Sequence, residues 1–324
     1  MSVPLLVVQE LRVHFPIRGG WFGRARGAIR AVDGVSFQIR AGETLGLVGE
    51  SGCGKSTLGN AILRIVDPIG GAVRLGDVDL AALDAAELRE ARRRVQMIFQ
   101  DPYASLDPRM TVGNSIGEPL LVHGLARGPK LRHDIESLLE RVGLSPAHAD
   151  RFPHEFSGGQ RQRLVIARAL ALSPDLIVCD EPVSALDVSV RGQILNLLLE
   201  LQRSLGTAYL FISHDLSVVR HVSDRIAVMY LGRIVEIAAR DALFSRPLHP
   251  YTRALISAIP LPDPVAQRTR GRIILRGETP SPASPPPGCP FHTRCPIAID
   301  VCRREVPVLT PKSSGASVAC HLVD

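Results

Sequence analysis

The chain has 324 residues, of which 45% are hydrophobic and 22% charged, and its formal net charge at pH 7 is +6. This composition excludes a disordered chain, and the length allows two or three domains or one large domain with an appendage. No stretch approaches 18 uninterrupted apolar residues and the N-terminus lacks a secretory signal pattern, so we expect a cytosolic protein without a transmembrane helix.

The N-terminal region is predicted to be largely extended. Apolar residues predict one strand over residues 5–13 and a second over 31–39. Between them, residues 16–30 contain four glycines and four arginines. Glycine-rich, charged stretches are typical of exposed connections, so we expect a loop there.

The stretch 45–57 carries the best-defined motif of the chain. A short apolar strand runs into Gly-x4-Gly-Lys-Ser, and a helix-like segment follows to Val66. Glycines let backbone N–H groups approach phosphate oxygens, and the helix N-terminus adds a favourable dipole. The lysine of such a loop reaches the β- and γ-phosphates, and the next hydroxyl ligates Mg²⁺. The predicted nucleoside triphosphate site consists of Gly49, Glu50, Ser51, Gly52, Cys53, Gly54, Lys55, Ser56 and Thr57.

The next segment changes from strands to helices. We expect strands over 72–80 and 95–99, a helix over 84–93, and a long helix that opens at 156–160 and runs through Leu172. Residues 111–149 have helical periodicity broken by glycine and proline, which indicates an inserted helical lobe.

The long helix opens with Ser157, Gly158, Gly159 and Gln160. Small residues at a helix start leave backbone N–H groups available to phosphate, again with the helix dipole behind them. One nucleotide does not need two such cradles in one chain. We therefore predict that this second cradle serves a nucleotide held by a partner chain, in a head-to-tail dimer with two composite sites.

From residue 175 onward, short apolar strands alternate with helices, which is typical of a parallel sheet buried on both faces. The strands are expected over 176–179, 208–212, 225–230 and 233–237, and the helices over 190–205 and 216–222. The first of these strands ends in Asp180 and Glu181. We predict that Asp180 holds Mg²⁺, directly or through water, and that Glu181 is the general base for the attacking water.

Two more polar residues follow apolar strands. His214 comes after strand 208–212, where an imidazole could hydrogen-bond the γ-phosphate; a purely structural histidine is the alternative. Gln100 ends strand 95–99 just before the helical lobe. Its amide could sense Mg²⁺ and the attacking water and transmit the nucleotide state to the lobe.

After about residue 240 the composition changes, with a proline-rich region over 260–290 and a final group of cysteines. That group is Cys289, Cys295, Cys302 and Cys320. Four thiols in a reducing compartment favour a metal centre that stabilises a segment with little core of its own. Zinc sites more often show C-x2-C pairs, so an iron–sulfur cluster fits better, with zinc or free thiols as alternatives. His292 and His321 are alternative ligands, although we expect each to be a solvated or structural histidine. Cys53 and Cys179 are expected to be small apolar core residues.

Several motifs together resemble the ATP-binding cassette family over about residues 5–240. They are the P-loop, Gln100, Ser157–Gln160, Asp180–Glu181, Ser184–Asp187 and His214. Within that family the chain closely resembles the ATP-binding subunits of oligopeptide and dipeptide permeases, in particular the subunit designated F. The segments that carry this similarity are Val13–Arg18, Phe99–Pro108, Leu248–Thr252 and Gly288–Pro296.

The resemblance implies an α/β fold: a P-loop ATPase core with a parallel sheet, an antiparallel β subdomain, an inserted helical subdomain over about 101–172, and a C-terminal cysteine-containing appendage. The nucleotide-binding domain would cover 1–240 and the extension 241–324. The implied site roles are adenine stacking for Phe15, phosphate and Mg²⁺ binding for Gly49–Thr57, a Mg²⁺-sensing Q-loop residue for Gln100, the signature sequence for Ser157–Gln160, a dimer-seam position for Asp187, and the switch histidine for His214. The four C-terminal cysteines would carry a 4Fe-4S cluster.

The resemblance further implies an ATP-hydrolysing subunit that powers uptake of dipeptides or oligopeptides, with ATP and Mg²⁺ as cofactors. Its implied partners are a sister ATPase subunit, two transmembrane permease subunits contacted mainly by residues 101–125, and a periplasmic or lipid-anchored solute-binding protein. It would lie at the cytoplasmic face of the bacterial inner membrane and bind no nucleic acid. The alternatives are import of another solute, such as a nickel chelate or glutathione, and a soluble ATPase acting on DNA or protein assembly. Intact Lys55, Asp180, Glu181 and His214 disfavour a non-catalytic subunit.

Overall fold

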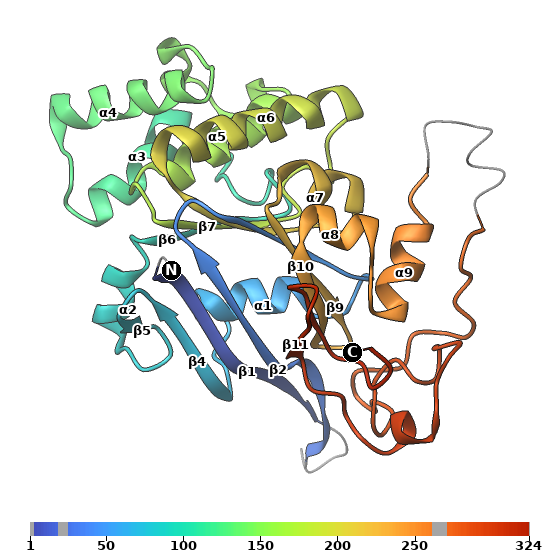
Figure 1. Ribbon diagram of the computed structural model, residues 1–324. Helices are drawn as coiled ribbons and strands as arrows, with labels where there is room; N and C mark the ends of the chain where they lie inside the picture. The colour runs from blue at the N-terminus through green and yellow to red at the C-terminus, as the bar shows by residue number, and fades with distance from the viewer. Residues whose placement is uncertain (1–2, 19–24, 261–270, 324) are drawn as a thin grey trace. The chain divides into compact units, whose positions relative to one another are not determined.

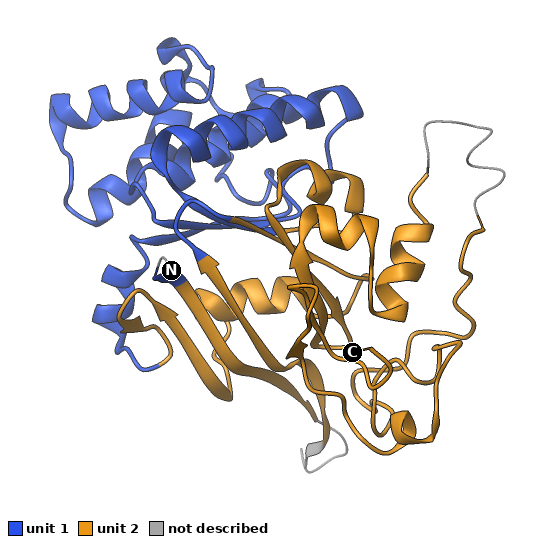
Figure 2. Ribbon diagram, in the orientation of Figure 1, with its two compact units in different colours: residues 1–5, 40–43, 82–211 blue, residues 6–39, 44–81, 212–324 orange. Residues whose placement is uncertain are grey.

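The computed structural model describes residues 3–18, 25–260 and 271–323, and the chain forms two compact units (Figure 2). Unit 1 comprises residues 1–5, 40–43 and 82–211, and unit 2 comprises residues 6–39, 44–81 and 212–324. Both units combine strands with helices, which confirms the predicted α/β class. In the described part of the chain, no helix is long and apolar enough to span a bilayer.

Unit 1 contains the predicted helical lobe and three strands (Figure 1). Its elements are α2 (Ala85–Ala91), β6 (Val95–Ile98), α3 (Val112–Val122), α4 (Gly128–Arg141), η1 (Pro146–Asp150), η2 (Pro153–Glu155), α5 (Gly158–Leu170), β7 (Leu176–Asp180), α6 (Val188–Leu205) and β8 (Ala208–Ile212). Strand β7 lies between β6 and β8, and it runs parallel to β6 with Val95 opposite Leu176. Every residue of β7 and β8 is buried, which explains why both read as unbroken apolar runs.

Helix boundaries in unit 1 follow capping signals in the sequence. The Asp84 side chain accepts hydrogen bonds from two N–H groups of α2, and the Glu87 carboxylate accepts one from the Asp84 N–H, which completes a capping box. Thr111 caps α3 by accepting from the Asn114 N–H. Helix α5 contacts α3, α4, α6 and β6, so it forms the centre of the lobe.

Unit 2 contains two groups of strands. Its elements are β1 (Pro4–Arg18), β2 (Ala25–Arg40), β3 (Thr44–Val48), α1 (Lys55–Ile62), β4 (Gly70–Leu75), β5 (Val78–Asp79), α7 (Leu216–Val222), β9 (Arg225–Tyr230), β10 (Arg233–Ala239), α8 (Arg240–Ser245), α9 (Pro250–Ser257), η3 (Asp300–Arg303), β11 (Thr310–Pro311) and β12 (Ser317–Val318). One sheet has the order β2-β1-β4-β5, and the other group runs β11-β12-β10-β9-β3. Strands β3 and β9 are parallel, whereas β10 pairs antiparallel with both β9 and β12.

The prediction of a loop over residues 16–30 is wrong for those of its residues that the structure describes. Strand β1 continues to Arg18 and β2 already begins at Ala25, and residues 19–24 lie outside the described residues. The two strands are neighbours in the sheet. Ladder hydrogen bonds join backbone groups, so pairing with a neighbour can extend a strand through a glycine- and arginine-rich stretch that composition alone assigns to a loop.

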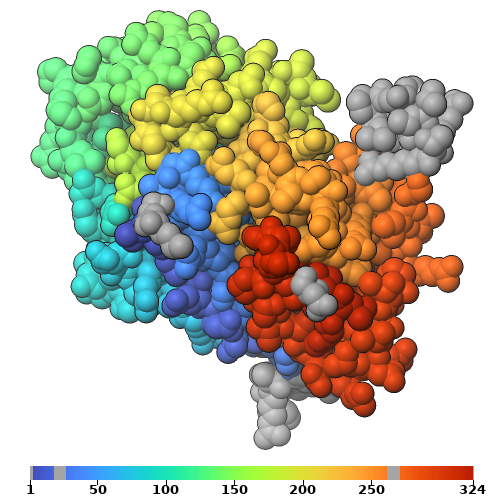
Figure 3. All heavy atoms as spheres, viewed as in Figure 1, coloured from blue at the N-terminus to red at the C-terminus, as the bar shows by residue number. Residues whose placement is uncertain are grey.

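The C-terminal segment joins the sheet of unit 2 instead of lying apart from it. Strand β12 pairs with β10, with Val318 opposite Glu236 and Ser317 opposite Ile237. Figure 3 shows this segment (red) as one continuous surface with the orange residues that precede it. Beneath it, Glu236 is fully buried and accepts hydrogen bonds from the N–H groups of Leu248 and His249, each over 2.9 Å.

His249 is a buried neutral imidazole at the start of α9. Its side chain is 1% exposed, and Nδ1 accepts a hydrogen bond from the Tyr251 N–H over 3.1 Å. Burial, helped by the nearby Arg253 charge, lowers the pKa of His249 to about 3. Burial also raises the pKa of the Glu236 carboxyl, in spite of its hydrogen bonds.

These shifts predict a pH dependence of stability. An unfolded chain protonates a histidine near its ordinary pKa of about 6.5, so His249 should lower the free energy of unfolding as the pH falls from about 6.5 toward 3. Glu236 acts in the opposite sense, because a raised pKa stabilises the folded chain at low pH and this contribution is lost as pH rises. A His249→Asn variant keeps a hydrogen-bond acceptor for the start of α9. From pH 7 to pH 4.5, its free energy of unfolding should decrease less than that of the parent, by up to a few kcal/mol.

Denaturant unfolding of the full chain at both pH values measures this difference. His133→Asn, at an exposed position of α4, is the matched control and should follow the parent. Parallel pH profiles for the parent and the His249 variant would contradict the assignment.

Candidate nucleotide site

The P-loop surrounds a buried lysine. Strand β3 leads into the glycine-rich loop 49–54, and α1 begins at Lys55. The Lys55 side chain is 6% exposed, and its ammonium donates hydrogen bonds to the carbonyls of Gly49 (2.8 Å) and Glu50 (3.0 Å). A buried ammonium requires such partners, so these carbonyls hold Lys55 inside the loop. Its positive charge therefore lies where an anionic phosphate would enter.

Two glycines make this tight turn feasible. A Cβ atom on Gly49 would lie 2.2 Å from the Met229 carbonyl oxygen. At Gly54, where φ is 105°, a Cβ atom would lie 1.9 Å from the Ala31 carbonyl oxygen. The loop thus combines close backbone approach, a lysine ammonium and a helix N-terminus, and this set fits the phosphates of a nucleoside triphosphate.

Other predicted residues of unit 2 lie at defined places around this loop. The Ser213 N–H donates to the Leu47 carbonyl over 3.1 Å, so the segment that carries His214 runs beside β3, the strand that precedes the P-loop. Asp215 then caps α7. The His214 side chain is exposed, as is that of Ser56 on the first turn of α1. Phe15 lies in β1 with 39% of its side chain exposed, which leaves ring surface available for stacking.

Unit 1 brings together two residues that are 81 positions apart in the sequence. Asp180 ends β7 in a buried position, and Glu181 follows with a φ of 47°. A left-handed backbone is unfavourable for a residue with a side chain and is concentrated at functional sites. The Gln100 side-chain amide donates to the Glu181 carboxylate over 3.3 Å. Strands β6 and β7 are parallel, so Gln100 and Glu181 follow ends that meet at the same edge.

The predicted signature residues begin α5 with a capping box. The Ser157 hydroxyl accepts from the Gln160 N–H over 3.3 Å, and the Gln160 side chain accepts from the Ser157 N–H over 3.0 Å. Gly159 lies against α6, since a Cβ atom there would be 2.4 Å from Cγ1 of Val190. Asp187 is the N-cap residue of that helix. Unit 1 therefore places the signature next to the start of the helix that Asp187 precedes.

Sequence reasoning missed two arginines of α5 that hold the segment after Gln100. Arg161 donates to two carbonyls of η2, and its guanidinium lies 4.0 Å above the ring of Tyr103. Arg168 donates to the Ser105 carbonyl over 3.2 Å and to the Glu118 carboxylate over 2.8 Å. The only signal in the sequence was the recurrence of arginine within a helix that is mostly buried.

The four C-terminal cysteines are not arranged as the predicted metal centre in the part of the chain that the structure describes. Among the described residues, no group of three or more His, Cys, Asp or Glu side chains is arranged to hold a metal ion. The Cys289 N–H donates to the Cys302 carbonyl over 2.8 Å, so parts of the segment converge. Burial raises the pKa of the Cys289 thiol to about 11, and the other three cysteines add to this effect. The thiols thus lie within electrostatic range of one another, but a cluster or a zinc ion needs four thiolates around one common point.

The alternative histidine ligands have backbone partners. His292 Nδ1 lies 2.9 Å from the Cys289 carbonyl oxygen, and His321 Nε2 lies 3.0 Å from that of Glu305. Each ring is therefore oriented by a hydrogen bond within the tail. The two remaining cysteines, Cys53 and Cys179, are buried, and burial raises the pKa of both thiols.

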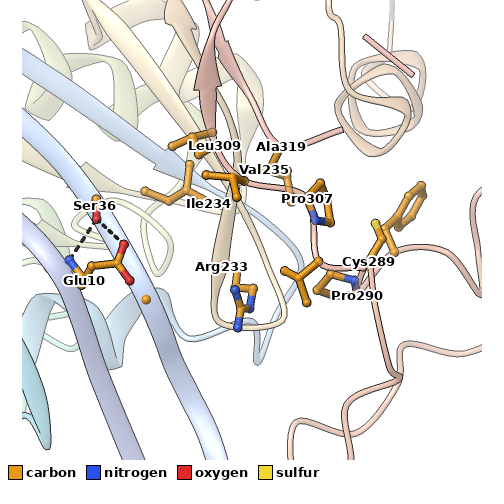
Figure 4. A pocket seen from close by; sticks show the side chains of 14 residues that line it. Glu10, Ser36, Arg233, Ile234, Val235, Cys289, Pro290, Pro307, Leu309 and Ala319 are labelled. Carbon is orange, nitrogen blue, oxygen red and sulfur yellow. Dashed lines mark hydrogen bonds between the residues drawn. The ribbon is translucent and has the colours of Figure 1, made fainter. Parts of the chain in front are cut away.

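Unit 2 also contains a cavity of about 430 Å³ between β1, β10 and the C-terminal segment (Figure 4). Glu10 and Ser36 lie at one side of it, and Cys289 and Pro307 lie at the other. The described residues that line this cavity do not include the P-loop, so we assign the nucleotide to the loop around Lys55 and not to this cavity.

The chain is similar to known transporter proteins along nearly its whole length. The family model described as ABC transporter matches residues 32–184, and the model for the C-terminal region of oligopeptide/dipeptide transporters matches residues 235–302. The probable peptide ABC transporter ATP-binding protein y4tS of Sinorhizobium fredii is 56% identical over 322 residues, which cover 99% of this chain and 91% of that protein. The oligopeptide transport ATP-binding protein AppF of Bacillus subtilis is 51% identical over 319 residues, with 98% and 97% covered.

A solved structure is similar to the larger part of the chain. It is the dimeric post-hydrolysis state of the ATP-binding cassette MJ0796 bound to ADP and Pi, with a TM-score of 0.64 and 29% identity. The match covers 72% of this chain and 98% of that one.

The contact between α5 and α6 predicts different outcomes for two adjacent glycines. Gly159→Ala should destabilise the fold by about 1–3 kcal/mol, because its methyl group collides with Val190. Gly158→Ala is the matched control, since a Cβ atom there would lie 3.6 Å from Leu186 in ordinary contact. The control should be neutral, or more stable by up to about 1 kcal/mol from helix propensity. Equal denaturant midpoints for the two variants of the full chain would refute the close packing at Gly159.

Proposed function

The chain belongs to the ATP-binding cassette family of transporter ATPases, and from this premise we propose that it is the ATP-hydrolysing subunit of an importer for dipeptides or oligopeptides. The observation that carries the ATPase part is the P-loop, in which buried Lys55 is held by two loop carbonyls ahead of α1. The cargo part is supported by y4tS and AppF, which are named for peptide and oligopeptide transport and match this chain almost end to end.

The proposed roles follow from the chemistry of each side chain. The P-loop binds the phosphates, and Phe15 stacks on adenine. Ser56, Asp180 and Gln100 would supply oxygen ligands to Mg²⁺, which neutralises phosphate charge when bound. Glu181 takes a proton from the attacking water, and His214 donates a hydrogen bond to the γ-phosphate. The contact between Gln100 and Glu181 supports this assignment, because it holds the base in one orientation.

We further propose that two ATPase subunits act together, with Ser157–Gln160 and Asp187 facing the nucleotide of the partner. The solved cassette that resembles this chain is a dimer with ADP and Pi. In this chain the first residues of α5 are small, and Ser157 is exposed, so their N–H groups suit a phosphate supplied from outside. A sister subunit rather than an identical one is the proposed partner.

The permease would bind the helical lobe at its exposed apolar residues. Tyr103 is 65% exposed, and Leu121 and Val122 are also exposed. Apolar side chains on the surface of a lobe are suited to a partner helix. Two permease subunits and a solute-binding protein would complete the importer at the cytoplasmic face of the inner membrane. Co-purification with permease subunits separates this proposal from a soluble ATPase, and transport assays separate peptides from nickel chelates or glutathione.

The proposed domain division is a nucleotide-binding domain over 1–240, with its helical subdomain at about 101–172, and an extension over 241–324. The two family models support it, because they match separate regions, 32–184 and 235–302.

The 4Fe-4S centre remains a proposal for the loaded protein, with zinc as the alternative. Its support is the chemistry of the donor set: four thiols within electrostatic range of one another, in a segment that contains short strands and little helix. Thiolates are the ligands of both kinds of centre.

The general-base role predicts that Glu181→Gln lowers the rate of ATP hydrolysis by about 10²–10⁴ while ATP still binds. The amide keeps the size of the side chain but cannot accept the proton. ATPase assays and nucleotide binding in the assembled transporter check this, with Glu140→Gln at an exposed position of α4 as the control. Full turnover by the Glu181 variant would sink the assignment.

The metal proposal predicts about four irons and four sulfides for each chain after anaerobic purification, with broad visible absorption. Replacing Cys295 with serine should abolish iron binding, whereas Cys179→Ser, in the buried strand β7, should retain it. Stoichiometric zinc without iron would identify a structural zinc site. Metal-free protein under these conditions would overturn both forms of the proposal.

A further inference from the structure

Three residues of the C-terminal part of the chain converge on one residue of the P-loop, Glu50. They are Tyr251 at the start of α9, Thr279, and Arg294 within the cysteine-rich segment. They lie 201, 229 and 244 positions from Glu50 in the sequence. None of these contacts follows from the phosphate-binding pattern, which leaves the second position of the loop open to any residue.

The contacts involve both the backbone and the side chain of Glu50. Its N–H donates to the Tyr251 hydroxyl over 3.0 Å. Its carboxylate accepts from the Thr279 hydroxyl over 2.8 Å and from the Arg294 guanidinium over 2.9 Å. Arg294 also donates to the Thr279 hydroxyl over 3.2 Å, so the two tail residues are bonded to each other as well. Hydrogen bonds between charged groups are stronger than neutral ones, so this is a firm attachment.

The ion pair is shielded from solvent. The Arg294 side chain is 9% exposed and that of Glu50 is 27% exposed. Burial by itself would lower the pKa of Arg294, but the hydrogen bonds and charge interactions with Glu50 and Tyr230 together raise it. Removing one partner of a pair this poorly screened strongly destabilises the fold, because the other charge remains buried.

A buried aromatic core lies next to the attachment. The rings of Tyr230, Tyr251 and Phe291 pack with centroids 4.7–5.4 Å apart, and all three are buried. The Arg294 guanidinium lies 5.9 Å from the centre of the Tyr230 ring. This packing therefore positions Tyr251 and Arg294 for their hydrogen bonds to Glu50.

Glu50 in turn positions the lysine that binds phosphate. The Lys55 ammonium donates to the Glu50 carbonyl over 3.0 Å and to the neighbouring Gly49 carbonyl over 2.8 Å. Any shift of Glu50 therefore moves one of the two oxygens that hold the ammonium. A continuous chain of contacts runs from Arg294 through Glu50 to Lys55, all within unit 2.

We infer that the C-terminal extension clamps the P-loop in its nucleotide-binding shape, with Arg294 as the positioning residue that acts through Glu50. The inference rests on the proposed ATP site and extends it to a segment that contains no nucleotide-binding motif. Arg294 directly precedes Cys295, so the backbone of the four-cysteine segment carries the clamp. ATP affinity thereby depends on how that segment is folded.

The test is ATP binding by the full chain in equilibrium titration, together with the KM for ATP and kcat in the assembled transporter. Arg294→Met removes the charge but keeps much of the side-chain volume. It should weaken ATP binding and raise KM about tenfold, which corresponds to about 1.4 kcal/mol. It should leave kcat within about twofold, because Arg294 contacts none of the reacting groups. Arg294→Lys keeps a charge and should recover part of the affinity.

A double-mutant cycle with Glu50→Gln identifies the route. If Arg294 acts through Glu50, the double variant should bind ATP no more weakly than the poorer single variant. Arg304→Met, an exposed arginine of the same tail, is the matched control and should bind ATP like the parent. Thermal unfolding of each variant identifies any that fail to fold. If Arg294→Met does not fold, the same cycle is measured with Arg294→Lys and Glu50→Gln.

The outcomes separate this inference from the proposed function. Parent-like affinity in a folded Arg294→Met variant, or additive losses in the double variant, would overturn the clamp and leave the ATPase assignment intact. A parent protein that binds no ATP, or binds it equally well after Lys55→Ala, would overturn the ATP site itself. A loss of kcat without a change in KM would also refute a positioning role for Arg294.

Discussion

The burial of one charge, the ammonium of Lys55, is the constraint on which the site depends. Its N–H groups need acceptors away from water, and the carbonyls of Gly49 and Glu50 provide them. For these carbonyls to converge, the loop turns so tightly that Gly49 and Gly54 lie against backbone carbonyls of β9 and β2. The same lysine therefore accounts for the glycine pattern of the loop and for the close approach of two strands.

The C-terminal extension contacts this loop and supports its conformation. Its strand β12 extends the sheet at β10, and its aromatic core supports Tyr251 and Arg294 at Glu50. In unit 1, α5 has a comparable supporting role, because its arginines hold the segment after Gln100. Each unit thus supports a segment with a predicted catalytic or phosphate-binding role by side chains that the motifs themselves do not contain.

Much of the fold and of the candidate site was predictable because its signals are local. The apolar runs of β7 and β8 identified buried strands, and the glycines, lysine and hydroxyl of residues 49–57 identified the phosphate loop. The extension of β1 to Arg18 and the start of β2 at Ala25 were missed, since strand pairing depends on a neighbour and not on composition. The metal centre was inferred from the number and spacing of the cysteines and from the family resemblance, but spacing along a chain does not specify whether four thiols meet at one point.

The sequence by itself determined the family and the α/β class, and it predicted which residues bind phosphate or act as acid and base, because each of these features has its own pattern of side chains along the chain. Only the tertiary structure decided which of these residues touch. It placed Gln100 on Glu181 across parallel strands, and it placed Arg294 on Glu50 across 244 positions of sequence. Contacts of this kind arise when distant segments bury surface against one another, and no local pattern of residues records that packing.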